Sequence, residues 1–310
     1  MSIARLSITS AFARNGRAIH MLLKVIVLGA AVSVPAIHAQ QPAAGMTALE
    51  GFRADAQYLP DDPLLGFVPV PAGTFQMGSN PLIDPMAFEN ERWSEGRRQG
   101  VVDLPLFYMS RFEVTVAQFR AFAEATGLTV DPMALTGEPS HPVTYVSWTD
   151  ALAYGRWLQA ELQADPATPA ELRELLDNGW TLTLPDEAQW EKAARGDDGR
   201  IFPWGNQPDR SRSNFSSAGT VPVGSLSCPD CSYGLSDMSG NVWEWTRSPY
   251  QPLPFDPSDD AETIGEDALW VMRGGSFNDA ENNARAAVRG AADPGARRAF
   301  IGFRLALVRL

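Results

Sequence analysis

Cys228 and Cys231 are the only cysteines of the 310-residue chain, and they form a C-x-x-C pattern. In an oxidising compartment such a pair forms a small disulfide, whereas a helix N-terminus that lowers the pKa of one thiol makes the pattern redox-active. Pro229 and Gly234 give the surroundings turn character, and no thioredoxin-like strand–helix unit precedes them. We favour a structural disulfide that holds the loop before Tyr233, with redox activity as the alternative. A zinc site would need two further ligands nearby, and none is evident.

Three charged residues, Glu191, Glu244 and Arg304, stand among aromatic residues. A lone charge in apolar surroundings is costly, so each is expected either to be paired in a salt bridge or to bind a cation. The sequence leaves both interpretations open.

His141 is the only histidine outside the first 39 residues, because the other two are His20 and His38. A single histidine is expected to be a hydrogen-bonding residue of the core rather than a metal ligand. The two-histidine, one-carboxylate site of non-haem iron enzymes cannot be built from it, so no histidine-ligated iron is predicted.

The elements that must position these residues include both helices and strands. Thr115, either Ser147 or Thr149, and Asp186 each precede an apolar pattern of helical spacing, and we expect a helix after each. Before the first helix we expect a strand, a Pro-Gly turn and a strand over 67–78, a long polar loop over 79–103, and a strand-like stretch over 104–114. An insertion over 160–180 is expected to extend the second helix. From Phe202 onward we expect a loop-rich half.

The first 39 residues are typical of an export signal. They carry four basic residues and no acidic ones, and an almost wholly apolar stretch, 25–34, precedes a plausible cleavage point after Ala39. That stretch is too short to span a membrane, so we expect no stable membrane insertion and a periplasmic or secreted protein. Met21 is an alternative start. Residues 40–65 are expected to be a linker and lead-in, and 66–310 a single domain.

The expected mature chain is strongly acidic. Without the four basic residues of 1–39, 21 of the 25 Lys and Arg remain against 37 Asp and Glu, a net charge of about −16. Such a surface repels phosphate backbones, so nucleic acid is not an expected partner, whereas cationic ligands are plausible.

Six segments, in order, make the chain resemble the formylglycine-generating-enzyme (sulfatase-modifying factor) superfamily. They are 71–78 (PAGTFQMG), 108–115 (YMSRFEVT), 141–148 (HPVTYVSW), 184–191 (LPDEAQWE), 234–245 (GLSDMSGNVWEW), and 273–277 (RGGSF) with 301–304 (IGFR). The resemblance implies an α+β fold, the formylglycine-generating-enzyme fold, which is a loop-rich variant of the C-type lectin fold.

The resemblance also shows which chemistry is missing. In the copper enzymes of the family two cysteines follow the RGGS motif and bind copper, a metal that soft thiolates suit. Their positions fall on Asp279 and Ala284 here, so neither copper nor haem is expected, and formylglycine generation by that mechanism is disfavoured. A branch of sulfoxide synthases holds iron with histidines of an added domain, which one histidine cannot replace. The chain is closest in type to an exported branch that acts in pyoverdine siderophore maturation and lacks the copper cysteines.

The resemblance further implies a calcium site, because hard oxygen ligands suit Ca²⁺. The positions concerned are Ser239, Gly240, Asn241, Val242 and Glu244. A second family calcium site would begin at Asn214, but its remaining ligands fall in a stretch that is deleted here after Ser217.

The groove of the family lies near the RGGS segment. By resemblance, its catalytic candidates are Ser276, Asp279 and Glu281, and its ligand-binding candidates are Trp245, Asn278, Asn282 and Arg285. Asp279 and Glu281 suit general acid–base work if burial separates their pKa values. The alternative is that all of these are solvated loop residues.

Three functions remain open at this stage. The first is an exported maturation protein that oxidises or tailors a small molecule or peptide of siderophore type. The second is a non-catalytic, lectin-like module that binds a ligand or a protein. The third, formylglycine generation on sulfatases, is disfavoured by the missing cysteines. Catalysis itself, the substrate and the oligomeric state are not fixed by the sequence.

Overall fold

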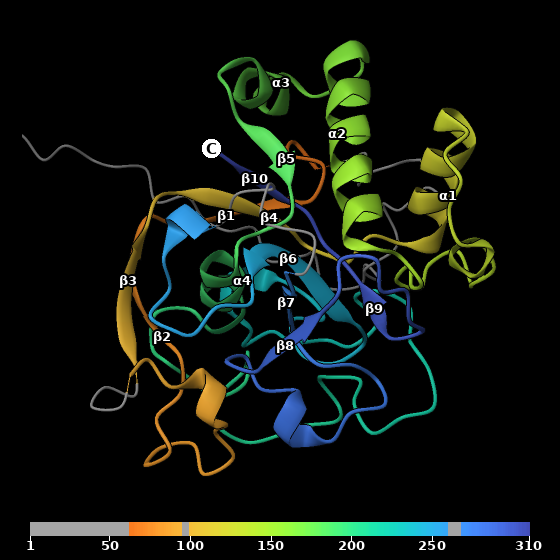
Figure 1. Ribbon diagram of the computed structural model, residues 1–310. Helices are drawn as coiled ribbons and strands as arrows, with labels where there is room; N and C mark the ends of the chain where they lie inside the picture. Colours follow the sequence, from red (N-terminus) through yellow and green to blue (C-terminus); the bar gives the residue numbers. More distant parts are fainter. Residues whose placement is uncertain (1–61, 95–98, 260–267) are drawn as a thin grey trace, which may run out of the picture. The chain divides into compact units, whose positions relative to one another are not determined.

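The computed structural model describes residues 62–94, 99–259 and 268–310 (Figure 1). The predicted export signal 1–39 and nearly all of the predicted linker 40–65 lie outside the described residues. Within the described ranges three sheets pack with four α-helices, which agrees with the predicted α+β class. No helix in those ranges is long and apolar enough to cross a membrane. The relation to C-type lectins stays a prediction.

The first sheet joins the two ends of the described chain. Its antiparallel strands lie in the order β1-β4-β10-β5, with bounds β1 Phe67–Val70, β4 Phe107–Ser110, β10 Ala306–Val308 and β5 Thr181–Thr183. A second sheet pairs β2 (Gly73–Met77) with β3 (Gly100–Leu104). The predicted strands within 67–78 therefore exist but join different sheets. Gly73 adopts a φ of +133°, which favours glycine, and turns the chain out of the first sheet.

The third sheet carries the RGGS segment. Its order is β8-β7-β6-β9, antiparallel except for the parallel pair β6·β9, with bounds β6 Trp243–Pro249, β7 Trp270–Arg273, β8 Arg289–Ala292 and β9 Ile301–Gly302. The half from Phe202 onward, predicted as loop-rich, therefore contains regular strands from Trp243 onward. These strands are short and several residues in a row are buried, so they lack the in–out alternation that reveals a strand.

The helices begin where their capping residues predict. The four helices are α1 (Val116–Thr126), α2 (Trp148–Ala164), α3 (Ala170–Asp177) and α4 (Glu187–Arg195). Thr115, Ser147 and Asp186 form capping boxes with the residue three positions on, so the prediction of three helix starts is confirmed, with Ser147 rather than Thr149 as the cap. The predicted extension of the second helix through 160–180 is wrong, because α2 ends before Pro166 and α3 begins after Pro169.

Five short 3₁₀ turns complete the described elements. They are η1 (Glu89–Glu91), η2 (Pro132–Leu135), η3 (Ser232–Gly234), η4 (Pro257–Asp259) and η5 (Glu281–Asn283). Four of them, η1, η3, η4 and η5, fall within segments predicted from sequence as loops or loop-rich.

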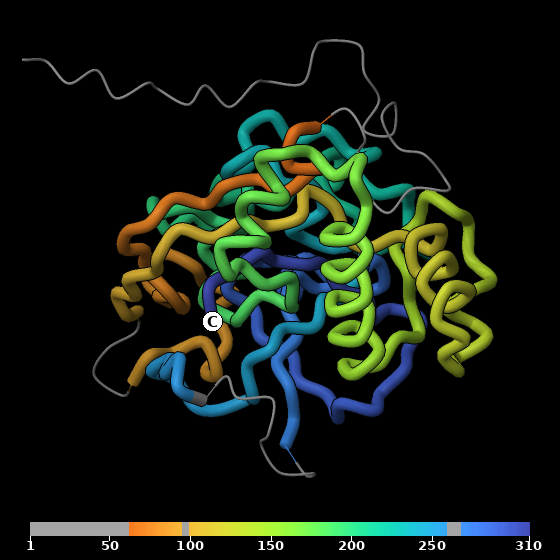
Figure 2. The backbone as a smooth tube through the Cα atoms, turned by 90° about the horizontal axis from the view of Figure 1, so that it is seen from above, coloured from red at the N-terminus to blue at the C-terminus, as the bar shows by residue number. Residues whose placement is uncertain are grey.

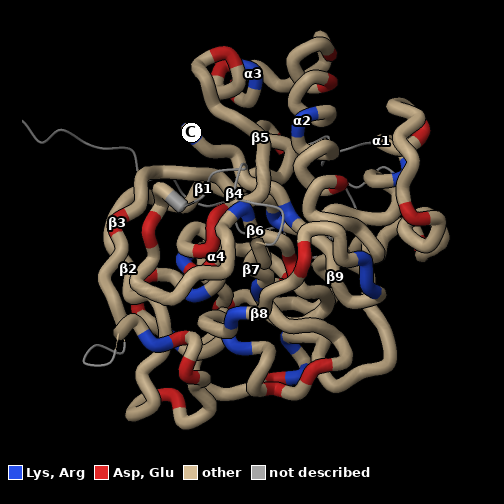
Figure 3. Tube along the Cα trace, in the orientation of Figure 1, with Lys and Arg blue, Asp and Glu red and all other residues tan. Residues whose placement is uncertain are grey.

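Helix α4 lies at the centre of the region that positions the RGGS segment. All nine of its residues are buried, and it contacts β2, β6 and β7. Helices α1 and α2, by contrast, lie side by side away from α4 (Figures 1 and 2). Acidic and basic stretches are interspersed around α4, β7 and β8 (Figure 3). Because charges are rarely buried unpaired, this part of the core is expected to be held by ion pairs.

Candidate functional site

The candidate site begins at Arg273, the last residue of β7, whose side chain is fully buried. Its guanidinium donates to the carboxylates of Glu187 and Glu191, both on α4. Glu191 also accepts from Arg195 at 2.9 Å, and Glu187 from Arg289 at 2.8 Å. The sequence left a salt bridge or a cation open for Glu191, and the structure shows the salt bridge. This network fixes the end of β7, from which the site loop departs.

The RGGS turn requires its second glycine. Gly275 has a φ of +72°, and a Cβ there would lie 2.3 Å from the carbonyl oxygen of Asn283. A side chain at this position would therefore collide with backbone. The close approach closes residues 275–283 into a compact loop.

Asp279 is the hydrogen-bonding centre of this loop. Its carboxylate accepts from the indole Nε1 of Trp243 at 2.8 Å and from Nδ2 of Asn283 at 2.8 Å, as well as from the backbone N–H (3.0 Å) and the hydroxyl of Ser276. The segment around Ser216 also contacts this loop, because the backbone N–H of Ser216 donates to the Asp279 carbonyl at 2.8 Å. The carboxylate that replaces the first copper cysteine is thus used to hold the loop together.

Ala284, at the second cysteine position, is fully buried in an apolar cluster. The other members of that cluster are Ile201, Phe202 and Phe215, with Met86 and Trp204 packed against them. A methyl group in apolar packing offers no metal ligand. The donor set of this loop therefore does not fit the copper site that the family resemblance implies.

Arg285, predicted to bind a ligand, is buried and anchors a different loop. Its guanidinium donates to Asp84 at 2.6 Å and to both oxygens of Glu91, at 2.6 and 2.9 Å. Burial lowers the pKa of Arg285, but the hydrogen bonds and charges of Glu91 and Asp84 outweigh it and raise the pKa overall. These contacts tie the loop between β2 and β3 to the site loop.

Trp245 also lies away from solvent. Its side chain is fully buried, and its indole donates to the carbonyl of Val146 at 3.0 Å. Of the predicted groove residues, Asn278 and Glu281 are exposed and Asn282 is half-buried. The structure therefore brings Ser276, Asn278, Asp279, Glu281 and Asn282 together in one loop, and places Trp245 and Arg285 in the packing beneath.

The predicted calcium ligand Glu244 is engaged by protein groups. Its carboxylate accepts from Arg304 at 2.6 Å through both oxygens and from the indole of Trp190 at 2.6 Å. This salt bridge is one of the two interpretations that the sequence left open for Glu244 and Arg304.

Two of the other calcium positions are also used within the protein. Ser239 donates to the Ala284 carbonyl at 2.6 Å, and the Asn241 carbonyl accepts from the Phe277 N–H at 2.9 Å. Because Glu244, Ser239 and Asn241 already have these protein partners, we derive no step through calcium. Calcium binding stays a prediction from the resemblance.

Two further carboxyl groups lie close to the Glu244–Arg304 pair. Burial raises the pKa of Asp237 to about 6, while its hydrogen bond from the Gly224 N–H and the charge of Arg304 oppose that shift. Burial and the charges of Asp237 and Glu244 raise the pKa of Glu113 well above its usual value. Both acids lie in segments that carry the family resemblance, 108–115 and 234–245, but neither was singled out there as a site residue.

The two cysteines form the predicted disulfide, with their Cα atoms 5.3 Å apart. His141 is half-buried, and its Nδ1 lies 2.8 Å from the Thr220 hydroxyl, which agrees with the predicted hydrogen-bonding role. Sequence reasoning missed the contacts of Trp243 and Asn283 with Asp279, although Trp243 lies in the segment 234–245 and Asn283 follows the groove candidate Asn282. It gave no signal for Asp84 and Glu91, which fall in the predicted polar loop 79–103.

Comparisons with known proteins agree with this architecture. Residues 54–309 match the model of the sulfatase-modifying factor enzyme 1-like domain. A formylglycine-generating enzyme of Thermomonospora curvata is 29% identical, covering 80% of this chain and 95% of the relative. A hercynine oxygenase of Mycolicibacterium smegmatis is also 29% identical, but the match covers 76% of this chain and only 60% of the relative.

A solved structure, PvdO from Pseudomonas aeruginosa, has a TM-score of 0.61 and 26% identity over 78% of this chain and 93% of its own. The predicted family and its α+β fold are thereby confirmed. With its RGGS turn and the packed loop 276–285 intact, the chain belongs to the family of sulfatase-modifying factor enzyme 1-like domains.

Proposed function

We propose that the chain tailors a small molecule or peptide of siderophore type by oxidation in the periplasm or outside the cell, without copper–cysteine chemistry. The observation that carries the proposal is the loop 276–285, where the Asp279 carboxylate and the Ala284 methyl group stand at the positions that the resemblance gives to the two thiolates. The similarity to a hercynine oxygenase and to PvdO supports tailoring chemistry.

The exposed face of the loop is the part that a substrate can reach. Asn278 offers an amide, Glu281 a carboxylate and Asn282 a second amide, the groups that orient a polar ligand by hydrogen bonds. Asp279 holds the loop in its conformation instead of contacting the substrate, because its carboxylate oxygens already accept hydrogen bonds from Trp243 and Asn283. The loop is thus a rigid platform for binding, and the oxidant must come from outside these side chains, as dioxygen or a partner redox protein.

The test incubates the purified chain with a peptide siderophore precursor under air and follows the mass of the precursor by liquid chromatography and mass spectrometry. We expect loss of hydrogen from the precursor, and a rate at least roughly tenfold lower for Glu281→Gln combined with Asn278→Ala. Glu124→Gln, an exposed carboxylate of α1, is the matched control and should leave the rate unchanged. Conversion of a sulfatase peptide in the presence of copper would instead favour formylglycine generation.

A second function, a non-catalytic binding module, is favoured by the engagement of Asp279. A carboxylate that accepts four hydrogen bonds is poorly suited to move a proton. Precursor binding that depends on Asn278 and Glu281, with no mass change under air, would establish this function in place of the first.

A further inference from the structure

A glycine of β8 leaves the space in which the Trp243 indole lies. A Cβ at Gly290 would be 2.9 Å from Cζ3 of that ring and 3.2 Å from Cε3 and Cη2. Two carbon atoms pack best at about 3.5–4.0 Å, so the six-membered ring lies directly on the backbone of β8. A side chain at Gly290 would therefore have to displace either the ring or the strand.

Both the strand and the ring are held in place. β8 pairs with β7, and Arg289, next to Gly290, binds both carboxylate oxygens of Glu187. Trp243 is only 8% exposed, and its backbone N–H donates to the Phe300 carbonyl at 2.8 Å. The strain of a side chain at Gly290 would therefore fall on the side-chain torsions of Trp243, and the indole would turn.

The indole begins a chain of hydrogen bonds through Asp279 and Ser276 to Asn278. Oδ2 of Asp279 accepts from Nε1 of Trp243 at 2.8 Å and from the Ser276 backbone N–H at 3.0 Å. These two donors match the two lone pairs of one carboxylate oxygen. The Ser276 hydroxyl has a single proton and two acceptors in reach, Oδ2 of Asp279 and Oδ1 of Asn278 at 2.7 Å. The contact of Trp243 with Asp279 therefore favours donation of that proton to Asn278.

Asn278 is the exposed end of this chain of hydrogen bonds. Its Oδ1 faces Ser276, and its Nδ2 has no hydrogen-bond partner in the part of the chain that the structure describes. The amide thus offers N–H groups to a ligand that carries an acceptor, such as a carbonyl or carboxylate oxygen. We propose that Gly290 is a positioning residue of the candidate site, because the space it leaves for Trp243 fixes the Asn278 amide for such a ligand. The ligand contact rests on the proposed function, whereas the order of the loop does not.

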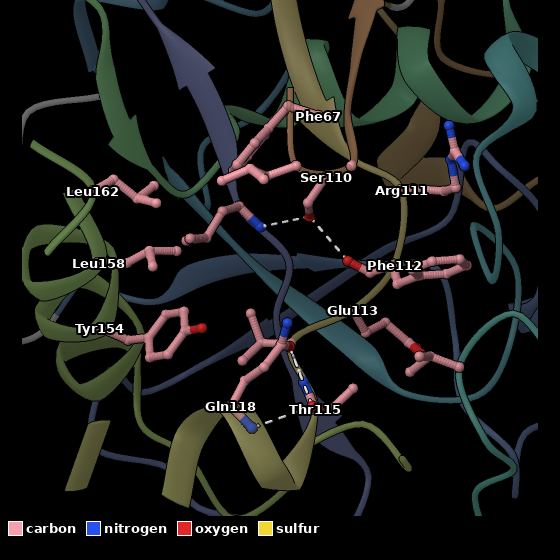
Figure 4. Close-up of a pocket in the computed structure, with 15 residues that line it drawn as sticks. Phe67, Ser110, Arg111, Phe112, Glu113, Thr115, Gln118, Tyr154, Leu158 and Leu162 are labelled. Carbon is pink, nitrogen blue, oxygen red and sulfur yellow. Dashed lines mark hydrogen bonds between the residues drawn. The ribbon is translucent and has the colours of Figure 1, made fainter. Parts of the chain in front are cut away.

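The cavity of Figure 4 provides a control that is separate from this chain of hydrogen bonds. Tyr154 and Leu158 of α2 line the cavity, and the described residues of its wall do not include Gly290 or the loop 276–285. Leu158→Val removes one methylene group from the wall and should destabilise the fold. This variant separates a general loss of stability from a change in the site loop.

The experiment records the NMR signals of Trp243 Nε1–H and Asn278 Nδ2 in the ¹⁵N-labelled Gly290→Ala variant. We expect both signals to shift, and the indole N–H to exchange with solvent at least roughly tenfold faster, as the loss of one hydrogen bond implies. Gly219→Ala is the matched control, because Gly219 is exposed and a Cβ there meets no atom within 4 Å. Gly219→Ala and Leu158→Val should leave both signals unchanged.

Trp243→Phe keeps the test decisive if Gly290→Ala does not fold. It retains a ring against Gly290 but has no N–H donor, so the Asn278 signal should shift in this variant as well. Since the donor is already absent, adding Gly290→Ala to Trp243→Phe should shift the Asn278 signal no further. An unchanged Asn278 signal in either folded single variant, or a full additional shift in the double variant, would overturn the proposal.

The NMR signals need no substrate, so the result can be separated from the proposed function. In the precursor assay, Gly290→Ala should raise KM at least roughly threefold with a smaller change in kcat, because the amide that it disturbs binds the ligand. An absence of turnover in the unaltered chain would count against the tailoring activity alone, and the NMR signals would still decide the role of Gly290.

Discussion

By the family resemblance, Asp279 stands where the copper enzymes have a thiolate, and its own contacts give it a different role. Its oxygens accept from the Trp243 indole and the Asn283 amide, so the carboxylate replaces a metal ligand by a hydrogen-bonding centre. Ala284 changes in the opposite sense and joins the apolar cluster around Phe202 and Phe215. Asp279 holds the loop by hydrogen bonds, and Ala284 anchors it in the apolar cluster. Together these contacts keep the loop closed without a metal.

Glu244 gives the first prediction at this scale. Glu244→Gln leaves Arg304 buried without its paired carboxylate, and the loss of one partner of a buried ion pair costs about 3–5 kcal/mol of unfolding free energy. We expect a loss near the lower end of that range, because Glu113 and Asp237 can ionise in compensation.

The measurement is chemical denaturation in a chelator and again in excess calcium, with Glu124→Gln as the exposed control. The salt bridge alone predicts the same loss in both solutions. A loss that grows when calcium is added would show that Glu244 is also a calcium ligand, as the family resemblance implies.

Among the elements, α2 depends on its cap. Ser147→Ala removes the hydroxyl that accepts from the Asp150 N–H at 3.1 Å, and should lower the unfolding free energy by about 0.5–2 kcal/mol. Thr129→Ala, exposed in the loop after α1, is the control and should cost less than about 0.5 kcal/mol. Thermal or urea unfolding of both variants checks this, and an equal cost at the two positions would contradict the assignment of the cap.

The disulfide supports a second prediction for an element. Cys228 and Cys231 close a loop of four residues, for which the chain-entropy relation gives about 2 kcal/mol. The double variant Cys228→Ser, Cys231→Ser should lose about that much unfolding free energy, and the unaltered chain with a thiol reductant should match it. If the reduced chain instead keeps its stability and loses its activity, the pair is redox-active.

The helix starts could be predicted because a capping box lies within four residues of sequence, as at Thr115, Ser147 and Asp186. Strand partners could not, since β1 pairs with β4 about forty residues on and β4 pairs with β10 about two hundred residues on, and local pattern says nothing of such pairing. The candidate site, too, has a part that local motifs predict and a part that depends on contacts between distant segments. Its loop 276–285 follows from motifs, whereas the contact of Arg285 with Asp84 joins residues about two hundred positions apart.

For the whole molecule, buried ion pairs tie the third sheet to α4 and hold its strands together. Arg273 joins β7 to α4, and Arg289 joins β8 to the same helix through Glu187. Arg304, which follows β9, reaches Glu244 on β6. Because each guanidinium satisfies several buried acceptors, the scaffold can keep its geometry while the exposed loop residues vary, which is consistent with different chemistries in one family.

The acids near Arg304 predict how the stability of the whole molecule changes with pH. The pKa of Asp237 is raised from 3.8 to about 6, so between these values the folded chain binds more protons than the unfolded chain. Its contribution is therefore fully present below about pH 4 and is lost as the pH rises through 6, a decrease of about 3 kcal/mol. Glu113, whose pKa is also raised, acts in the same direction.

Asp237→Asn isolates this contribution, since the amide can still accept from the Gly224 N–H but does not ionise. Relative to the unaltered chain, the variant should have similar unfolding free energy at pH 4 and gain up to about 3 kcal/mol by pH 7. Urea denaturation at unit pH steps measures the difference, and carboxylates paired with arginine elsewhere cancel because both proteins contain them. A difference that stays constant from pH 4 to 7 would mean that Asp237 is ionised throughout, with Arg304 rather than burial in control of its charge.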